Sequence, residues 1–239
     1  MQAVVPFGRS LRAAGLAKSS TVDFPGRLSA VVFFAGCNYR CHYCHNAHIL
    51  DDPPLIDMEG AFAFLEKRAG LLDGVVLSGG EATLQPGLYS FADALRGMGY
   101  KIKLDTNGSR PDVVKAMLGG GLVDFVAVDY KAPFRMYGDI CMHGADGVGE
   151  TFGLLAESGV PYEIRVTAIP QIGEEELAEM AGSLPHLERF VLQPYRPVEG
   201  GGLHAVQGTW RQRPYTPAEL KRLAESVRHL QPNVAVRGI

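Results

Sequence analysis

Short apolar runs alternate along the chain with longer segments whose apolar residues recur at helical spacing. The runs predict buried strands, and the helical spacing predicts amphipathic helices. The expected strands cover residues 30–35, 74–78, 100–105, 124–129, 162–169 and 189–193. The expected helices cover residues 58–68, 86–97, 111–118, 147–158, 174–183 and 217–230. Pro217 at a first helical position, directly after Thr216 as an N-cap, marks the start of the last helix.

This alternation of strand and helix is typical of βαβ units on a parallel sheet. Six such units are too few for a closed barrel of eight, and they suit an open or partial barrel or a doubly wound sheet. Each of these architectures places its chemistry at the carboxyl ends of the strands. We expect one domain over residues 1–239, with a core at about 15–197 and a C-terminal helix and strand within 198–239.

Composition and charge narrow the classes of function. The 239 residues are 46% hydrophobic and 21% charged, which supplies enough apolar material for a sizeable core. The net charge of −3 gives no sign of a surface for nucleic acid or for a membrane. We find neither an apolar run of membrane-spanning length nor a signal-peptide pattern, so a cytoplasmic location is expected.

Polar and special residues gather where the expected strands end. The first strand runs into a segment with three cysteines, the second into Ser-Gly-Gly-Glu and the third into Asp-Thr-Asn-Gly. The fourth strand ends in Asp-Tyr-Lys, and the sixth leads into Gln-Pro-Tyr-Arg. Because the carboxyl ends of parallel strands share one edge, we expect these residues to form one functional rim.

The cysteines are the strongest chemical signal at this rim. Cys37, Cys41 and Cys44 lie within eight residues, whereas Cys141 stands apart. Three clustered thiols make a poor disulfide framework but a good metal or cluster site. A three-cysteine iron–sulfur cluster would leave one iron open to a ligand, whereas zinc would need a fourth ligand. That ligand would come from Cys141 or from a nearby histidine (His42, His45 or His48).

Each of the other rim residues also has a purely structural interpretation. The two glycines before Glu81 suit a tight turn with positive φ and close backbone approach, and Glu81 suits a helix cap. Asp105 and Asp129 are also typical of turns and N-caps. Cys141 is most simply a small buried hydrophobic residue. The functional interpretation depends on the occurrence of these residues together at one rim.

Cys37-x3-Cys41-x2-Cys44, with Tyr43 before the third cysteine, resembles the signature of radical S-adenosylmethionine (SAM) enzymes. The Gly79-Gly80-Glu81 turn fits the same superfamily. From about residue 15 to 197, further motifs resemble activating enzymes of glycyl-radical proteins, above all those of anaerobic ribonucleoside-triphosphate reductase. These motifs are STVDFPGRL (20–28), YCHN (43–46), LDTNG (104–108), VDYKAP (128–133), YEIR (162–165) and LQPYRP (192–197).

The resemblance implies a partial (β/α)6 barrel and a [4Fe-4S] cluster on Cys37, Cys41 and Cys44. It also implies that SAM chelates the open iron and is cleaved reductively to a 5′-deoxyadenosyl radical. That radical would remove a glycine Cα hydrogen from a partner, a glycyl-radical enzyme. A flavodoxin- or ferredoxin-type protein would supply the electron.

The resemblance further assigns roles to individual rim residues. Gly79, Gly80 and Glu81 would meet the methionine amino end of SAM, and Tyr43 would lie against its adenine. Asp105 and Thr106 would lie near the methionyl or ribose part, and Arg165 near the carboxylate. Asp105, Thr106 and Asp129 would also bind a monovalent cation. Lys131 would pair with Asp129 or contact the incoming glycine loop.

The chain departs from the family pattern at two positions. Ala82 stands where proline is common, which changes the rigidity of the turn. Activators of pyruvate formate-lyase resemble one another in having histidine at the position of Arg196. The arginine in this chain therefore favours an activator of the reductase type. The alternatives are action on another glycyl-radical protein such as pyruvate formate-lyase, or on a small molecule, and a non-enzymatic zinc module using the histidines. The glycine run Gly200–Gly202 suggests a loop, and Trp210 is a candidate residue for docking a partner protein.

Overall fold

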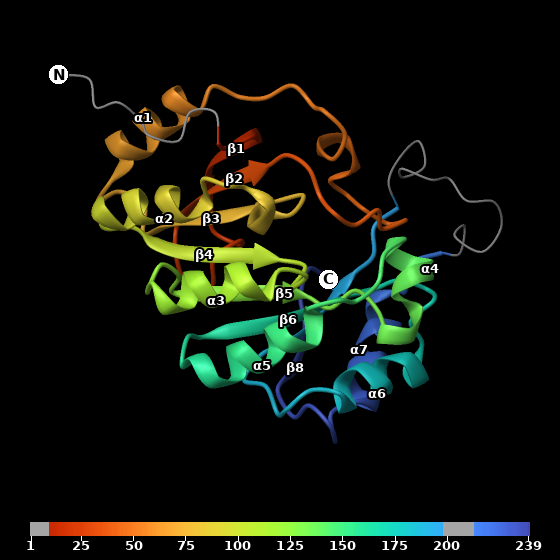
Figure 1. Ribbon diagram of the computed structural model, residues 1–239. Helices are drawn as coiled ribbons and strands as arrows, with labels where there is room; N and C mark the ends of the chain where they lie inside the picture. Colours follow the sequence, from red (N-terminus) through yellow and green to blue (C-terminus); the bar gives the residue numbers. More distant parts are fainter. Residues whose placement is uncertain (1–9, 198–212) are drawn as a thin grey trace. The chain divides into compact units, whose positions relative to one another are not determined.

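A computed structural model of the protein describes residues 10–197 and 213–239, which exclude Gly200–Gly202 and Trp210. Its strands and helices alternate along most of the chain (Figure 1). The strands are β1 (Ala13–Ser20), β2 (Ser29–Phe34), β3 (Gly74–Gly79), β4 (Lys101–Thr106), β5 (Phe125–Asp129), β6 (Tyr162–Ala168), β7 (Phe190–Pro194) and β8 (Val234–Val236). The α-helices are α1 (Met58–Arg68), α2 (Leu88–Gly97), α3 (Pro111–Gly119), α4 (Tyr137–Cys141), α5 (Val148–Ser158), α6 (Glu174–Gly182) and α7 (Pro217–Ser226).

The hydrophobic pattern of the sequence correctly predicted six of the strands and six of the α-helices of the structure. Each expected element is present, and α1 has the expected bounds. Thr216 accepts a hydrogen bond from the backbone N–H of Glu219 and caps α7 as predicted. Helix α7 ends at Ser226 rather than at residue 230, and residues 227–230 form a turn.

Two described elements, β1 and α4, were not expected. Strand β1 pairs antiparallel with β2, so the first pairing is not part of a βαβ unit. Its sequence AAGLAKSS has no β-branched residue, and most of its side chains are partly exposed, so it lacks the signal of a buried strand. Helix α4 has only five residues and ends at Met142 in the left-handed region, with φ 55°. The strands follow one another in sequence order from β1 to β8.

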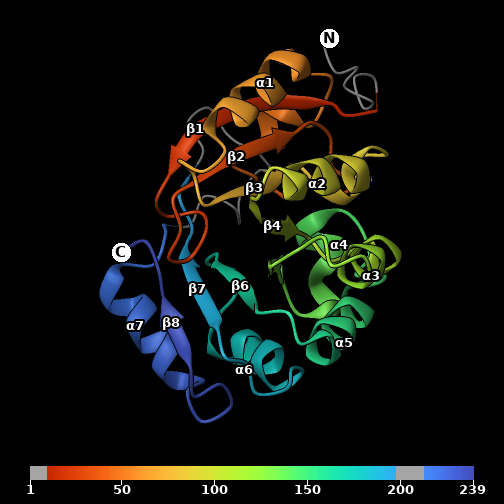
Figure 2. The same ribbon diagram turned by 90° about the vertical axis from the view of Figure 1, so that its left-hand side faces the viewer.

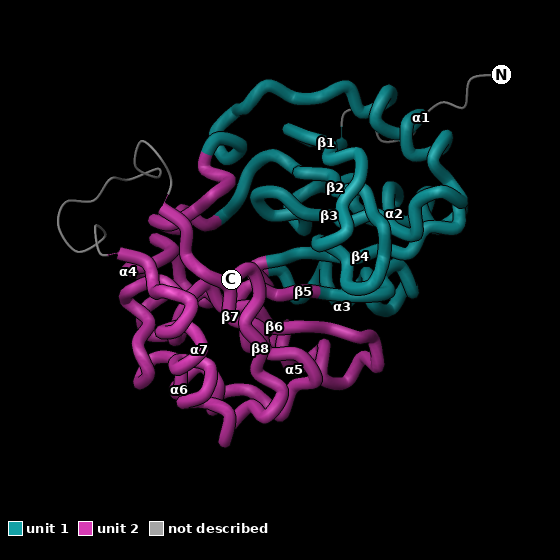
Figure 3. The backbone as a smooth tube through the Cα atoms, turned by 180° about the vertical axis from the view of Figure 1, so that it is seen from behind, with its two compact units in different colours: residues 1–38, 48–106, 110–126 teal, residues 39–47, 107–109, 127–239 magenta. Residues whose placement is uncertain are grey.

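The described chain divides into two compact units (Figure 3). Unit 1 contains the described residues up to 38, together with 48–106 and 110–126. In it, β2, β3 and β4 are parallel neighbours, with Val31 opposite Val76 and Val76 opposite Lys103. Helix α2 lies beside β3 and β4 (Figures 1 and 2). Its Phe91 packs edge-to-face on Phe34 of β2, with 6.2 Å between ring centroids.

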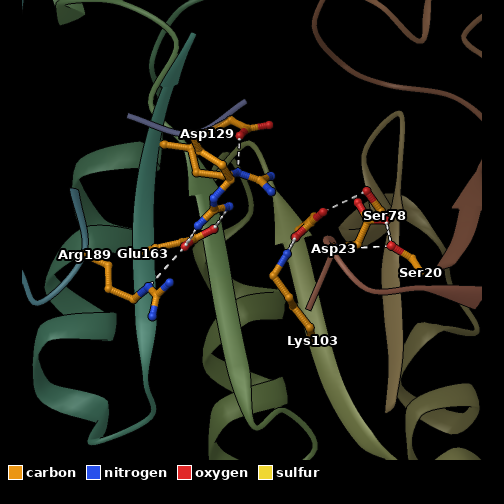
Figure 4. Close-up of polar contacts among 10 residues, drawn as sticks. Ser20, Asp23, Ser78, Lys103, Asp129, Glu163 and Arg189 are labelled. Carbon is orange, nitrogen blue, oxygen red and sulfur yellow. Dashed lines mark hydrogen bonds and ion pairs between the residues drawn. The ribbon is translucent and has the colours of Figure 1, made fainter. Parts of the chain in front are cut away.

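Unit 2 contains residues 39–47 and 107–109, together with the described residues from 127 onward. Here β6, β7 and β8 are parallel neighbours. The buried carboxylate of Glu163 on β6 accepts two hydrogen bonds from Arg237, at 3.0 and 2.6 Å, and lies 3.4 Å from Nε of Arg189 (Figure 4). This ion pair ties the residues after β8 to β6. Tyr130, Phe134, Tyr137 and Phe152 form an aromatic cluster behind β5.

Candidate functional site

The cysteine segment begins at a glycine that the backbone requires. Gly36 follows β2 with φ +86°, a left-handed conformation that side chains rarely adopt. Its N–H donates to the carbonyl of Ile49 at 2.9 Å, which closes the base of the loop within unit 1. Cys37 comes next and is partly exposed. Cys37 belongs to unit 1, and Cys41 and Cys44 belong to unit 2.

In unit 2, the backbone around Cys41 is held against the end of α4. The N–H of Arg40 donates to the carbonyl of Cys141 at 2.9 Å, and the N–H of His42 donates to Ile140 at 3.2 Å. Cys141 is fully buried, as predicted, and its thiol is also hydrogen-bonded to Cys41. That hydrogen bond lowers the pKa of Cys41 despite the opposing effect of burial. Burial raises the pKa of Cys44, the more exposed of the two motif cysteines in this unit.

Tyr43 lies between these two cysteines in the sequence, and its side chain is buried. Its side chain is 5% exposed, and its ring meets the edge of Tyr195 with 6.5 Å between centroids. Burial raises the pKa of its hydroxyl. Within the described residues, the hydroxyl oxygen has no hydrogen-bond partner. A buried polar atom without a partner is rare in a native structure and is consistent with a ligand site.

Asp129 ends β5 as part of a charged cluster within unit 2. Its Oδ1 accepts from Nε of Arg165 at 2.8 Å, and its Oδ2 accepts from Nζ of Lys131 at 3.0 Å. Burial would raise the pKa of Asp129, but the two positive charges outweigh burial and hold the pKa well below its usual range. Figure 4 shows this carboxylate with one of these contacts. The predicted pairing of Lys131 with Asp129 is confirmed.

The Gly79-Gly80-Glu81 turn in unit 1 requires both of its glycines. Gly79 has φ +122°, and a Cβ there would lie 2.3 Å from backbone atoms of Phe34. A Cβ on Gly80 would lie 2.1 Å from the carbonyl oxygen of Gly36. The N–H groups of Gly80 and Glu81 donate to the carbonyls of Phe34 and Gly36, both at 2.9 Å. The turn is thus joined to the residue before Cys37, and the expected close backbone approach is present.

Glu81 is 1% exposed and caps the short 3-10 helix Ala82–Leu84, as the structural interpretation predicted. Its Oε1 accepts from the backbone N–H of Thr83 at 3.0 Å. The same oxygen accepts from the hydroxyl of Thr106 at 2.7 Å, which links the end of β3 to the end of β4. Two of the predicted site residues therefore meet directly within unit 1.

Asp105 shares this edge of unit 1 with a residue that sequence reasoning missed. Lys103 is 1% exposed, and its ammonium contacts Oδ1 of Asp105. The hydroxyl of Ser78 donates to Oδ2 of the same carboxylate at 3.0 Å (Figure 4). The signal available was the spacing, because residues two apart on a strand project from the same face. Lys103 stands between Ile102 and Leu104 and two residues before Asp105, so the sequence contains the spacing of this ion pair but not its burial.

The motif side chains suit the cluster and cofactor that the sequence implies. None of the four cysteines forms a disulfide, so the three motif sulfurs can serve as cluster ligands. The hydrogen bond from Cys141, together with the positive charge of Lys131, lowers the pKa of Cys41, which favours its thiolate. The unpartnered hydroxyl of Tyr43 adds a polar atom that protein groups leave unused in the described residues.

Comparisons with known proteins agree with this chemistry. Residues 31–184 match the radical SAM superfamily. The chain is 29% identical over 236 residues to a Methanocaldococcus jannaschii protein provisionally named as a glycyl-radical enzyme activating enzyme, and the match covers 95% of each chain. It is 30% identical to the pyruvate formate-lyase-activating enzyme of Clostridium pasteurianum, over 73% of this chain and 77% of that one.

A solved structure supports the fold. Streptococcus suis SuiB bound to its precursor peptide SuiA superimposes with a TM-score of 0.70 and 18% identity, over 87% of this chain. The chain spans about half of SuiB, 48% of its length. This likeness supports the expected α/β fold of the partial-barrel type. Among the residues with a described position, no helix is both long and apolar enough to cross a bilayer.

Proposed function

Because the chain belongs to the radical SAM superfamily, and is an enzyme of the type that activates glycyl-radical enzymes, we propose that its partner is an anaerobic ribonucleotide reductase. The superfamily uses a [4Fe-4S] cluster and SAM, which are therefore the cofactors. The observation that carries the radical chemistry is the cysteine motif with its buried aromatic residue, Tyr43. The choice of the reductase as partner rests on Arg196 in the Gln-Pro-Tyr-Arg segment.

We assign Cys37, Cys41 and Cys44 as the ligands of the cluster. When bound, the reduced cluster supplies one electron that cleaves SAM to methionine and a 5′-deoxyadenosyl radical, which takes hydrogen from a glycine Cα. The N–H groups of Gly80 and Glu81 already donate to backbone carbonyls, so we assign the carbonyl oxygens of this turn to the methionine end of SAM. Carbonyl oxygens suit the amino group of SAM, which is a donor.

Other residues bind and orient. Tyr43 presents a buried ring and a hydroxyl without a protein partner in the described chain, which suit an adenine base. Arg165 is held by Asp129, and its guanidinium is assigned to the SAM carboxylate because this group suits carboxylates. Thr106 is held by Glu81, and Asp105 by Lys103 and Ser78, beside the same turn. These contacts fix each side chain before any ligand arrives.

The choice of partner depends on Arg196. Related activators of pyruvate formate-lyase resemble one another in having histidine at that place, and this chain has arginine. Burial, and then the charge of Arg196, lower the pKa of His45, so Arg196 acts electrostatically on the residue after the third motif cysteine. A pyruvate formate-lyase-type partner is the alternative, favoured by the similarity to such activators.

Electron paramagnetic resonance of the reconstituted, reduced protein tests the chemistry. We expect a reduced-cluster signal that changes shape when SAM is added, and formation of 5′-deoxyadenosine. Cys37→Ala, Cys41→Ala and Cys44→Ala should each abolish the signal and cleavage, whereas Cys141→Ala should keep the cluster. Retained cleavage in any of the three motif variants would refute the ligand assignment. Bound zinc and no cluster signal would refute the enzymatic function.

A second experiment tests the partner. The reduced protein, SAM and either anaerobic ribonucleotide reductase or pyruvate formate-lyase are mixed, and glycyl-radical formation is followed by the same spectroscopy. We expect the radical on the reductase only. A radical on pyruvate formate-lyase alone would establish the alternative and leave the radical chemistry intact.

A substitution tests the role of Asp129 in the site. Asp129→Ala should slow SAM cleavage with the cluster signal unchanged.

A further inference from the structure

Lys103 is a fully buried lysine at the centre of β4. Its side chain is 1% exposed, and its two strand neighbours, Ile102 and Leu104, are also buried. Desolvating an ammonium costs several kcal/mol unless a partner compensates the charge. The partner here is Asp105, two residues along the same strand and therefore on the same face.

The Asp105 carboxylate is occupied on both oxygens. Oδ1 contacts the ammonium of Lys103, and Oδ2 accepts from Ser78 at 3.0 Å. Replacement of a buried ion pair by apolar residues is often neutral or stabilising, so fold stability alone gives no reason for lysine at this position. Asp105 precedes Thr106, which donates to Glu81 of the turn after β3, so the pair lies next to a contact with the Gly79-Gly80-Glu81 turn, which points to a role in the site.

These contacts disagree with the monovalent cation expected from the resemblance. A cation at Asp105 would face the ammonium of Lys103 on the same carboxylate. Asp129 is paired with both Lys131 and Arg165. Both carboxylates of the expected cation site are therefore already neutralised by cations of the chain itself. As they stand, these residues do not fit a bound Na⁺ or K⁺.

We propose that the Lys103 ammonium neutralises and orients Asp105 in place of a metal cation, so that SAM binds equally well without Na⁺ or K⁺. Lys103 is then a positioning residue that acts through Asp105. This inference rests on the proposed function, because it concerns the site assigned to SAM. Its distinguishing consequence is independence from alkali-metal ions.

Equilibrium binding of SAM to the cluster-loaded protein tests the inference. The affinity is measured in NaCl, KCl and tetramethylammonium chloride at one ionic strength. For the wild-type protein we expect dissociation constants that agree within about twofold in the three salts. Lys103→Met should bind about tenfold more weakly in the tetramethylammonium salt, and Na⁺ or K⁺ should recover about fivefold. Lys101→Met is the matched control, because Lys101 is an exposed lysine on the same strand that pairs with Asp124 instead.

The outcomes separate the inference from the proposed function. Wild-type affinity that rises severalfold on adding Na⁺ or K⁺ overturns the inference and leaves the enzyme assignment standing. The same holds if Lys103→Met binds SAM like the wild type in every salt. An absence of SAM binding by the wild-type protein in all three salts overturns the proposed function itself. The wild-type comparison needs no variant, so the test does not depend on whether Lys103→Met folds.

Discussion

The close contact between Gly80 and Gly36 predicts a large effect of adding one methyl group. In Gly80→Ala, the new Cβ would lie 2.1 Å from the carbonyl oxygen and 2.7 Å from the carbonyl carbon of Gly36. Both are backbone atoms, so no flexible side chain can move aside. The residues after β2 and β3 must separate, and two hydrogen bonds cross this contact, from Gly80 to Phe34 and from Glu81 to Gly36.

The magnitude follows from these two effects. Overpacking of a close-packed site costs about 1–3 kcal/mol. Each weakened backbone hydrogen bond adds about 0.5–1.5 kcal/mol. We therefore expect Gly80→Ala to lower the free energy of unfolding by about 3 kcal/mol. For a chain of this size, each kcal/mol shifts the melting temperature by about 2–4 °C, so a fall of roughly 6–12 °C is expected.

Thermal unfolding of the metal-free protein, followed by circular dichroism, measures this difference. Gly97→Ala is the matched control in the same unit. Gly97 ends α2, and no atom lies within 4 Å of the position that a Cβ would take there. Alanine at this position should be neutral or stabilising by up to about 1 kcal/mol. If Gly80→Ala and Gly97→Ala melt within about 2 °C of each other, the steric explanation of the glycine turn is wrong.

Two further predictions concern ion pairs in the separate units. Glu163→Gln should lower the free energy of unfolding by about 2–3 kcal/mol in chemical denaturation, because it leaves Arg237 facing a buried neutral group. Glu225→Gln removes an exposed ion pair with Arg228 and should change the free energy of unfolding by less than about 0.5 kcal/mol. Equal effects of the two substitutions would contradict the argument. Burial raises the pKa of Asp124, but hydrogen bonds from Lys101 and a backbone N–H outweigh burial and lower it. Asp124 therefore stabilises the fold above its unfolded pKa of about 3.9, and the stability is lost as pH falls through the lower folded value. Thermal melts at several pH values should show Asp124→Asn about 1–2 kcal/mol less stable at pH 7, with the gap narrowing below about pH 4; a gap that is constant with pH would contradict the linkage.

The hydrophobic pattern predicted the strands that bury apolar side chains and missed β1, most of whose side chains are partly exposed. Strands β2, β3 and β5 are nearly continuous apolar runs, which is the signature of parallel strands covered by helices. Strand β1 forms from alanine, glycine, leucine, lysine and serine because its partner β2 supplies the hydrogen bonds. Tertiary pairing determines β1, and a local pattern contains no information about that partner.

The candidate site divides in the same way. The cysteine motif and the glycine turn are local in sequence, so spacing alone identified them. The hydrogen bond between Cys141 and Cys41 joins residues one hundred positions apart, and only the placement of α4 beneath the cysteine segment reveals it. Lys103 was visible in the sequence, but lysine on a strand usually points to solvent. The fold buries it because Asp105 offers a partner on the same face.

The polar groups of the rim are satisfied within their own units before a ligand arrives. In unit 1, Glu81 is fixed by Thr83 and Thr106, and Asp105 by Lys103. In unit 2, Asp129 is likewise fixed by Lys131 and Arg165. Side chains locked in this way lose little rotamer freedom on binding, so more of the contact energy remains as affinity. The internal lysines and arginine that make the buried carboxylates tolerable for the fold therefore also preorganise them for a cofactor.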